Sequence, residues 1–127
     1  MKKVLVADDE FSIRKLYERE LRKEGYEVVF ATNGQEAIQM VRNGRPDLIV
    51  MDIRMPGMDG IEAMSRILEE NNDLPVVINT AYSSYKENFL SWSADAYLTK
   101  SADLSELKGT IRNIFDRGRT PQGCTAS

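Results

Sequence analysis

The sequence contains no histidine, which removes the commonest general base and metal ligand from any chemistry of this chain. Its single cysteine, Cys124, excludes an intramolecular disulfide and is consistent with a reducing compartment. The apolar run in MKKVLVADDE is too short for a signal peptide, and no run approaches the roughly 18 apolar residues of a membrane helix. A net charge of −3 without a basic stripe disfavours direct nucleic-acid binding. We therefore expect a cytoplasmic protein, with no membrane partner, whose chemistry depends on carboxylates, hydroxyls and lysine.

The composition that remains is that of one globular domain. The 127 residues are 42% hydrophobic and 29% charged, enough for a single buried core without disulfides or metals as staples. The last ten residues, GRTPQGCTAS, lack hydrophobic periodicity. We expect a domain at residues 1–117, followed at 118–127 by a disordered tail, the start of a linker or a vector remnant.

Five β-rich runs alternate with segments of helical periodicity, which predicts an α/β fold with a parallel sheet covered on both faces. The expected strands are KVLVAD, EVVFAT, DLIVMD, PVVINT and DAYLTK. Apolar residues at helical spacing predict helices after the first three strands and after the fifth, and Gly25 suits the end of the first. Asp59 with Glu62, and Asp103 with Glu106, have capping-box spacing. The segment SSYKENFLSWS is the weakest expected helix because serines and aromatics support helices poorly.

Polar residues follow the predicted strands at the end where open α/β sheets collect ligands. Asp8, Asp9 and Glu10 follow the first strand and Asp52 the third, while Thr80 ends the fourth and Lys100 the fifth. Each has an ordinary interpretation as a helix-start charge, a cap or a surface cation. Asp52 is the exception, because it ends a strand buried on both faces, where a lone carboxylate is poorly solvated.

Clustered carboxylates with one lysine predict a divalent cation site, because the acids repel each other and one ammonium cannot neutralise them. An all-oxygen ligand set favours Mg²⁺ or Mn²⁺ over zinc. Phosphoryl oxygens bind at the open positions of such an ion, and a carboxylate can accept the phosphoryl group as an aspartyl phosphate. We expect Asp52 to be the nucleophile. Pro56 and Gly57 would shape the loop RMPGMDG so that it aims a carbonyl at the metal.

The motifs VADDE, DLIVMDIRMPGMDG, INTAY and AYLTK, in this order on these strand ends, resemble the receiver domain of two-component response regulators over residues 2–117. The resemblance implies a doubly wound, flavodoxin-like fold of five parallel strands in the order 2-1-3-4-5 with five helices. It also implies phosphorylation by a histidine kinase or histidine phosphotransferase, which agrees with the missing histidine. A downstream protein effector would read the phosphorylated surface.

The resemblance assigns roles to individual residues. Asp52 would be the phosphoacceptor, and the Mg²⁺ ligands would be Asp9, Asp52 and the carbonyl of Arg54, with Asp8 contributing through water. Thr80 would be the switch hydroxyl that moves to bond the phosphoryl group, and Lys100 would form an ion pair with that group. Tyr97 matches the switch aromatic, although a half-buried strand aromatic without a signalling role is the plain alternative.

The chain departs from the family pattern at three positions. Ser101 replaces the proline that usually follows the lysine, so we expect a trans bond after Lys100, because a non-proline cis bond costs about 3 kcal/mol. Ser93 replaces a common glycine, and Trp92 is unusual. In the family, the residues two past the phosphoacceptor and two past the threonine influence phosphoryl lifetime. Here these are Arg54 and Tyr82, both large, and we expect them to hinder the attacking water and lengthen that lifetime.

Three competing interpretations stay open at this point. A haloacid-dehalogenase-type phosphatase needs a second aspartate where Arg54 stands. A flavodoxin-like cofactor carrier needs a phosphate-binding first loop, whereas ADDEF would repel phosphate. A receiver that takes no phosphate would be a binding module only. As a stand-alone receiver the chain would act through its surface, as a monomer or a weak phosphorylation-dependent dimer, and it could equally be the amino-terminal part of a longer regulator.

Overall fold

The computed structural model describes residues 1–58, 60–81, 94–100 and 103–117 of the chain. The strands within these ranges are β1 (Lys3–Ala7), β2 (Glu27–Ala31), β3 (Leu48–Met51), β4 (Val76–Thr80) and β5 (Ala96–Thr99). The helices are α1 (Phe11–Lys23), α2 (Gly34–Gly44), α3 (Gly60–Glu70) and α4 (Ser105–Arg117). All five predicted strands are confirmed, as are four predicted helices. The helix expected at residues 83–93 lies outside the described residues.

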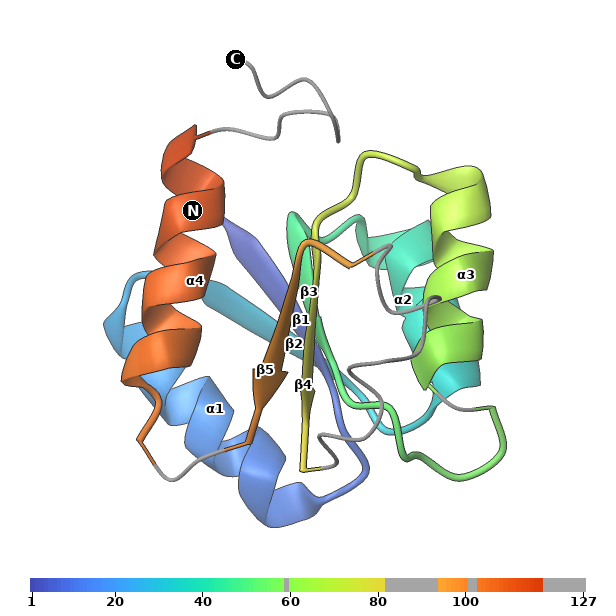
Figure 1. Cartoon of the computed structure of the whole chain (residues 1–127), viewed down its shortest axis with the longest axis horizontal. Helices are drawn as coiled ribbons and strands as arrows, with labels where there is room; N and C mark the ends of the chain where they lie inside the picture. The colour runs from blue at the N-terminus through green and yellow to red at the C-terminus, as the bar shows by residue number, and fades with distance from the viewer. Residues whose placement is uncertain (59, 82–93, 101–102, 118–127) are drawn as a thin grey trace.

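The strands form one parallel sheet in the order β2-β1-β3-β4-β5, as the resemblance implied. Every residue of β3 and β4 is buried, whereas the edge strands β2 and β5 are partly exposed. Continuous apolar runs in the central strands are what a parallel sheet covered on both faces requires. Because the strands are parallel, their carboxyl ends share one edge of the sheet, at the bottom of Figure 1.

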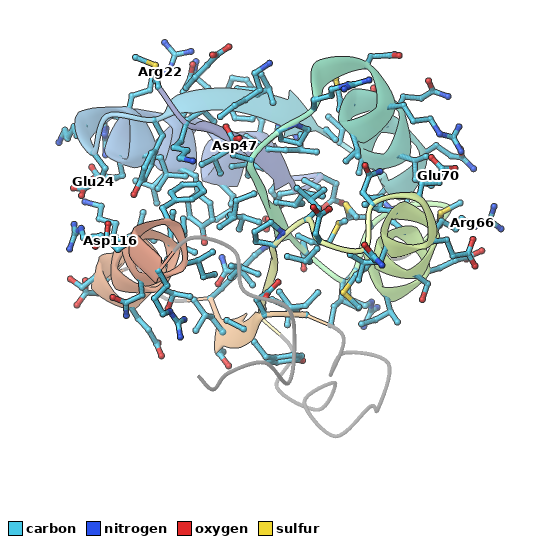
Figure 2. All side chains as sticks on the ribbon, turned by 90° about the horizontal axis from the view of Figure 1, so that it is seen from above. Arg22, Glu24, Asp47, Arg66, Glu70 and Asp116 are labelled. Carbon is cyan, nitrogen blue, oxygen red and sulfur yellow. The ribbon has the colours of Figure 1, made fainter. Side chains whose placement is uncertain are left out.

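Two apolar layers separate the sheet from its helices, with α1 and α4 on one face and α2 and α3 on the other (Figures 1 and 2). The α1/α4 layer contains Val4, Val6, Tyr17, Leu21, Val28, Leu48, Val50, Val77, Leu98, Leu104, Leu107, Ile111 and Ile114. The α2/α3 layer includes Leu5, Ile38, Val41, Ile49, Met51, Ile61, Met64, Ile67, Val76 and Ile78. Neighbouring strand residues alternate between the layers, so the period of two along each strand assigns its side chains to one layer or the other.

The helix ends follow from local sequence. Gly25 has φ +95° just after α1, a conformation that glycine adopts without steric cost. At the start of α2, Asn33 accepts a hydrogen bond from the Glu36 N–H (2.9 Å), a cap that our sequence analysis missed. Asp103 accepts from the N–H of Ser105 (2.9 Å) at the start of α4, whereas the pairing with Glu106 stays a prediction. The predicted cap at Asp59 lies outside the described residues.

Charged side chains of the helices point away from the sheet (Figure 2). The labelled Arg22, Glu24 and Asp116 lie on the α1/α4 side, and Arg66 and Glu70 lie on the α2/α3 side. No helix in the described ranges combines the length and the apolar character needed to cross a bilayer. The positions of the charged and apolar side chains show that each helix buries one apolar face on the sheet and leaves its charged face outside.

Candidate functional site

The carboxyl ends of the strands bring the predicted site residues together. The Asp52 N–H donates to the Ala7 carbonyl (3.0 Å), which fixes Asp52 beside the end of β1. The Lys100 N–H donates to the Thr80 carbonyl (2.8 Å), which fixes Lys100 beside the end of β4. These backbone bonds continue the sheet one residue past its strands. The prediction that the side chains meet at this edge is confirmed for the acids and the lysine.

Three carboxylates form an acid cluster at this edge, which we define as Asp8, Asp9 and Asp52. One oxygen from each lies within 4.8 Å of the others. Asp8 and Asp52 are buried, with exposed fractions of 2% and 5%, and Asp9 is exposed. Thr80 is completely buried. The cluster therefore has two acids facing the protein interior and one facing solvent.

Lys100 is the cation that the described structure provides to this cluster. Its Nζ lies 2.7 Å from Asp8 Oδ2, 3.2 Å from Asp52 Oδ2 and 3.7 Å from Glu10 Oε1. Burial alone would lower the pKa of Lys100, but the hydrogen bond to Asp8 and the negative charges of Asp52 and Asp8 outweigh it, so the pKa is raised. The lysine stays charged at neutral pH. One positive charge still faces two buried negative charges.

The two carboxylate oxygens of Asp52 differ in their contacts. Its Oδ2 accepts from Lys100, whereas its Oδ1 is buried and has no hydrogen-bond partner among the described residues. Burial raises the pKa of the Asp52 carboxyl and the charge of Asp8 adds to this, while Lys100 and a hydrogen bond from the Thr80 side chain lower it without offsetting the rise. A buried oxygen without a partner is costly, so the site is short of positive charge at this atom.

Both carboxylate oxygens of Asp8 have partners, unlike those of Asp52 among the described residues. Its Oδ1 accepts from the Glu10 N–H (2.9 Å) and its Oδ2 faces Lys100. Its backbone carbonyl accepts from Arg14 Nη1 (2.8 Å). We did not identify Arg14 from the sequence, where it looks like one more charge on the solvent face of α1. It anchors the end of β1 to the helix that follows.

The donors of the acid cluster fit a small divalent cation. All are carboxylate oxygens, which are hard ligands of the kind that Mg²⁺ takes one or two of while it keeps several waters. The unpaired Oδ1 of Asp52 and the excess of negative charge are the two features that a cation would relieve. The predicted fourth ligand, the carbonyl of Arg54, stays a prediction.

The loop after Asp52 turns back onto it. Gly57 has φ +78°, and the Gly60 N–H donates to the Ile53 carbonyl (2.7 Å). A Cβ on Gly60 would collide with the backbone carbonyl of Asp52, so the first residue of α3 packs directly against the strand end. Arg54 is exposed in this loop. Gly57 thus supplies a backbone conformation in the loop, as predicted, whereas Gly60 is needed because its lack of a side chain allows close packing.

The remaining predicted residues divide into two groups. Tyr97 is half-buried on β5 against the α2/α3 layer, which agrees with its expected position and leaves its role a prediction. Four positions lie outside the described residues, so the structure does not test them: Tyr82, Trp92, Ser93 and Ser101. The lifetime role of Tyr82 and the geometry of the bond between Lys100 and Ser101 therefore stay predictions.

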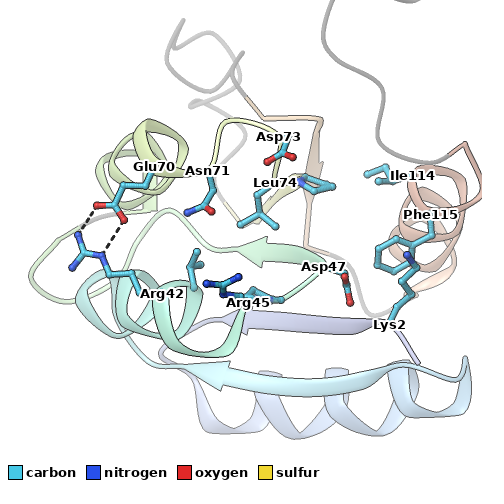
Figure 3. Close-up of a pocket in the computed structure, with 13 residues that line it drawn as sticks. Lys2, Arg42, Arg45, Asp47, Glu70, Asn71, Asp73, Leu74, Ile114 and Phe115 are labelled. Carbon is cyan, nitrogen blue, oxygen red and sulfur yellow. Dashed lines mark hydrogen bonds and ion pairs between the residues drawn. The ribbon is translucent and has the colours of Figure 1, made fainter.

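A cavity of about 580 Å³ lies at the other edge of the sheet, near the amino ends of the strands (Figure 3). It has an apolar floor that includes Leu74 and Phe115 and a rim of both charge signs. The Arg42 and Glu70 side chains close part of this rim through a two-point ion pair (2.7 and 3.1 Å). The residues predicted to carry chemistry are not among those that line it. The size of this cavity therefore does not make it the reactive site.

The sequence is similar to those of known response regulators. The family model for the response regulator receiver domain matches residues 4–112. The response regulator MprA of Mycobacterium sp. (strain KMS) is 36% identical over 123 residues, which cover 95% of this chain and 54% of that protein. The chain thus spans about half the length of the curated relatives that it matches.

Solved structures of a response regulator are also similar to this chain. The response regulator TrrA of Thermotoga maritima, in complex with Mg²⁺-BeF, superposes with a TM-score of 0.87 at 42% identity and covers 89% of this chain and 98% of that one. A structure of the histidine kinase ThkA in complex with TrrA matches with a TM-score of 0.84, over 89% of this chain and 97% of that one.

Proposed function

The chain belongs to the response regulator receiver domain family, and from this premise we propose that Asp52 accepts a phosphoryl group from a phosphohistidine on a partner protein. The observation that carries the proposal is the buried Asp52 carboxylate with an unpaired Oδ1, next to Lys100 and within ligand distance of two further acids. The proposed domain is residues 1–117. A cytoplasmic location and a monomer or weak phosphorylation-dependent dimer stay predictions.

The proposed step is a phosphoryl transfer from nitrogen to oxygen. A carboxylate oxygen of Asp52 attacks phosphorus, the P–N bond breaks with its electron pair left on the donor imidazole, and that nitrogen takes a proton from solvent. Lys100, which already contacts Asp52 at 3.2 Å, faces the charge of the transferred group. Positioning and charge neutralisation supply most of the catalysis in such a transfer, because the loose transition state needs little covalent help. By this proposal the chain catalyses its own modification and its later hydrolysis.

The acid cluster and the carbonyl of Arg54 would hold Mg²⁺, or Mn²⁺ in its place. When bound, the ion supplies positive charge between the acids and open positions for phosphoryl oxygens. The relative TrrA, crystallised in complex with Mg²⁺-BeF, supports this assignment. Asp8 is the ligand that would act through water, since its two oxygens are already hydrogen bonded.

Thr80 and Tyr97 are the proposed switch. Thr80 is buried at the end of β4, and its side chain lowers the pKa of the Asp52 carboxyl. A phosphoryl group on Asp52 would offer this hydroxyl new acceptor oxygens. Tyr97, on the neighbouring β5, would turn inward as Thr80 moves, so that the outer surface differs between the two states. A downstream effector would recognise that difference.

A histidine kinase or a histidine phosphotransferase is the proposed donor, because this chain has no histidine of its own. The complex of ThkA with TrrA supports a kinase partner. Phe11 is 67% exposed at the start of α1, next to Asp9 and Glu10. An exposed aromatic beside the acid cluster is a suitable anchor for the protein that delivers the phosphoryl group.

The experiment is phosphorylation by acetyl phosphate with Mg²⁺, followed by intact-mass measurement. We expect one phosphoryl adduct, which is absent in Asp52→Asn and absent when EDTA replaces Mg²⁺. The matched control is Asp47→Asn, which removes an exposed aspartate at the opposite edge of the sheet and should keep the adduct. If the wild-type protein takes no phosphoryl group, the chain is a binding module, and if it releases phosphate continuously it is a phosphatase.

The lifetime role of Arg54 and Tyr82 is tested by the decay of the adduct after the donor is removed. We expect Arg54→Asn and Tyr82→Ala to decay faster than wild type, because a smaller side chain admits the attacking water. Decay at the wild-type rate, or slower, contradicts this role.

A further inference from the structure

A polar pair is buried between β4 and α1, beside the apolar residues of the α1/α4 layer. Asn79 on β4 donates from Nδ2 to the Tyr17 hydroxyl on α1 at 2.6 Å. Asn79 is 4% exposed and Tyr17 is 2% exposed. The two residues are separated by 62 positions in the chain. A buried polar pair adds little stability compared with an apolar pair of the same shape, but it ties its two elements together in one geometry.

The pair lies directly behind the candidate site. Asn79 is the residue before Thr80, and the Thr80 carbonyl holds the N–H of Lys100. Val77 packs in the α1/α4 layer and Ile78 in the α2/α3 layer, so the alternation of β4 turns Asn79 toward α1. The charges of Lys100, Asp8 and Asp52 all influence the pKa of Tyr17, which burial raises, so this hydroxyl is close to the site as well.

A small cavity lies beside the pair. Its volume is about 10 Å³, and Tyr17, Asn79, Leu98 and Thr99 are among the residues that line it. This is close to the smallest space that holds one water molecule. Without its hydrogen bond to Tyr17, the buried Asn79 amide loses its contact to α1, and the end of β4 before Thr80 is held less firmly.

We propose that Tyr17 and Asn79 are positioning residues, whose hydrogen bond holds the end of β4 so that the Thr80 hydroxyl stays aligned with Asp52. The inference rests on the proposed function, in which Thr80 bonds the phosphoryl group. It predicts that the pair sets the rates at which the phosphoryl group is accepted and lost, although neither residue touches that group.

The test compares rate constants for formation and loss of the phosphoryl adduct with acetyl phosphate and Mg²⁺, at a temperature where every variant is folded by near-ultraviolet circular dichroism. Tyr17→Phe deletes one hydroxyl, and we expect the rates to change by about three- to tenfold. Asn79→Leu should change them similarly. The double variant Tyr17→Phe/Asn79→Leu restores an apolar layer, so it should fold well and still show the altered rates. This variant keeps the test decisive where a single change unfolds the chain.

Two controls separate positioning from general stability. Leu21→Ala removes buried volume from the same layer farther along α1, and it should leave both rates within about twofold of wild type while lowering the melting temperature. In a Thr80→Ala background, Tyr17→Phe should have no further effect, because the pair acts through Thr80.

An unchanged rate in Tyr17→Phe, or an effect that persists without Thr80, overturns the inference and leaves the proposed function intact. A wild-type protein without any adduct overturns both.

Discussion

The two edges of the sheet carry ion pairs in opposite surroundings. At the amino edge, Arg42 and Glu70 pair at 2.7 Å while each side chain is about half exposed. At the carboxyl edge, Lys100 is 14% exposed and faces buried acids. Water screens the first pair and reaches the second poorly, so the same type of contact has a different energetic value. Excess negative charge thus lies at the edge where solvent neutralises it least, which is the edge of the proposed site.

The largest effect should come from removing the buried cation. Lys100→Met keeps the aliphatic stem and leaves two buried carboxylates without their cation, and we expect a loss of about 3 kcal/mol in unfolding free energy in EDTA. Arg42→Met, at the other edge, should lose less than about 1 kcal/mol, and that loss should shrink in high salt. Urea unfolding of both variants measures the contrast. Equal losses would mean that the edges do not differ as described.

The glycines of the two edges should also respond in opposite directions. Gly60→Ala puts a methyl group against the carbonyl of Asp52, so we expect a loss of about 2 kcal/mol. Gly44→Ala, at the end of α2 with open space around the added Cβ, should gain about 0.5 kcal/mol from the better helix former. Chemical denaturation gives both values. A Gly60→Ala protein as stable as wild type would show that the loop has slack beside Asp52.

Charge removal at the carboxyl edge should stabilise the metal-free protein. The pKa of Asp52 is raised by burial above its ordinary value of 3.8, so its ionised form costs stability as the pH rises through the folded-state pKa. Asp52→Asn lacks this cost, and in EDTA it should melt at a higher temperature than wild type at pH 7. Near pH 3.8 and below, the two proteins should melt alike. Mg²⁺ should then stabilise wild type more than the variant.

The smallest effect is expected between the edges, where α1 faces α4. The hydrogen bond from Lys108 holds the pKa of Glu20 at about 2, below its ordinary value of 4.5. This carboxylate therefore adds stability above about pH 4.5, and the contribution is lost as the pH falls toward 2. Glu20→Gln should melt slightly below wild type at pH 7, with a gap that closes across that window. A gap that stays constant during acidification would contradict this assignment.

Much of the fold could be predicted because each element carries its own local signal. The continuous apolar runs of β1, β3 and β4 indicated strands buried on both faces, and the observed strands begin and end within one residue of those runs. The acid cluster followed from topology alone, since parallel strands place Asp8 and Asp52 at one edge. Gly25 marked the end of α1 through its unusual backbone freedom.

The contacts that escaped prediction join residues far apart in sequence. Tyr17 looked like one more apolar position of a helix, and Asn79 was a polar residue within an apolar strand, with nothing to indicate that they meet. The ion pair between Glu24, just after α1, and Arg112 on α4 depends in the same way on how two helices pack. The Asn33 cap is different, because its spacing with Glu36 was visible and overlooked.

The hydrogen bonds of Asp8 have a consequence for selectivity. Two neighbouring acids are buried at one sheet edge, and an incoming electrophile could in principle modify either of them. Asp8 offers no idle atom, since one oxygen is occupied by a backbone amide and the other by an ammonium group. Asp52, by contrast, keeps one oxygen that has no hydrogen-bond partner among the described residues. Under the proposed function, the contacts that occupy both oxygens of Asp8 would direct the phosphoryl group to Asp52. No further residue would be needed to distinguish the two carboxylates.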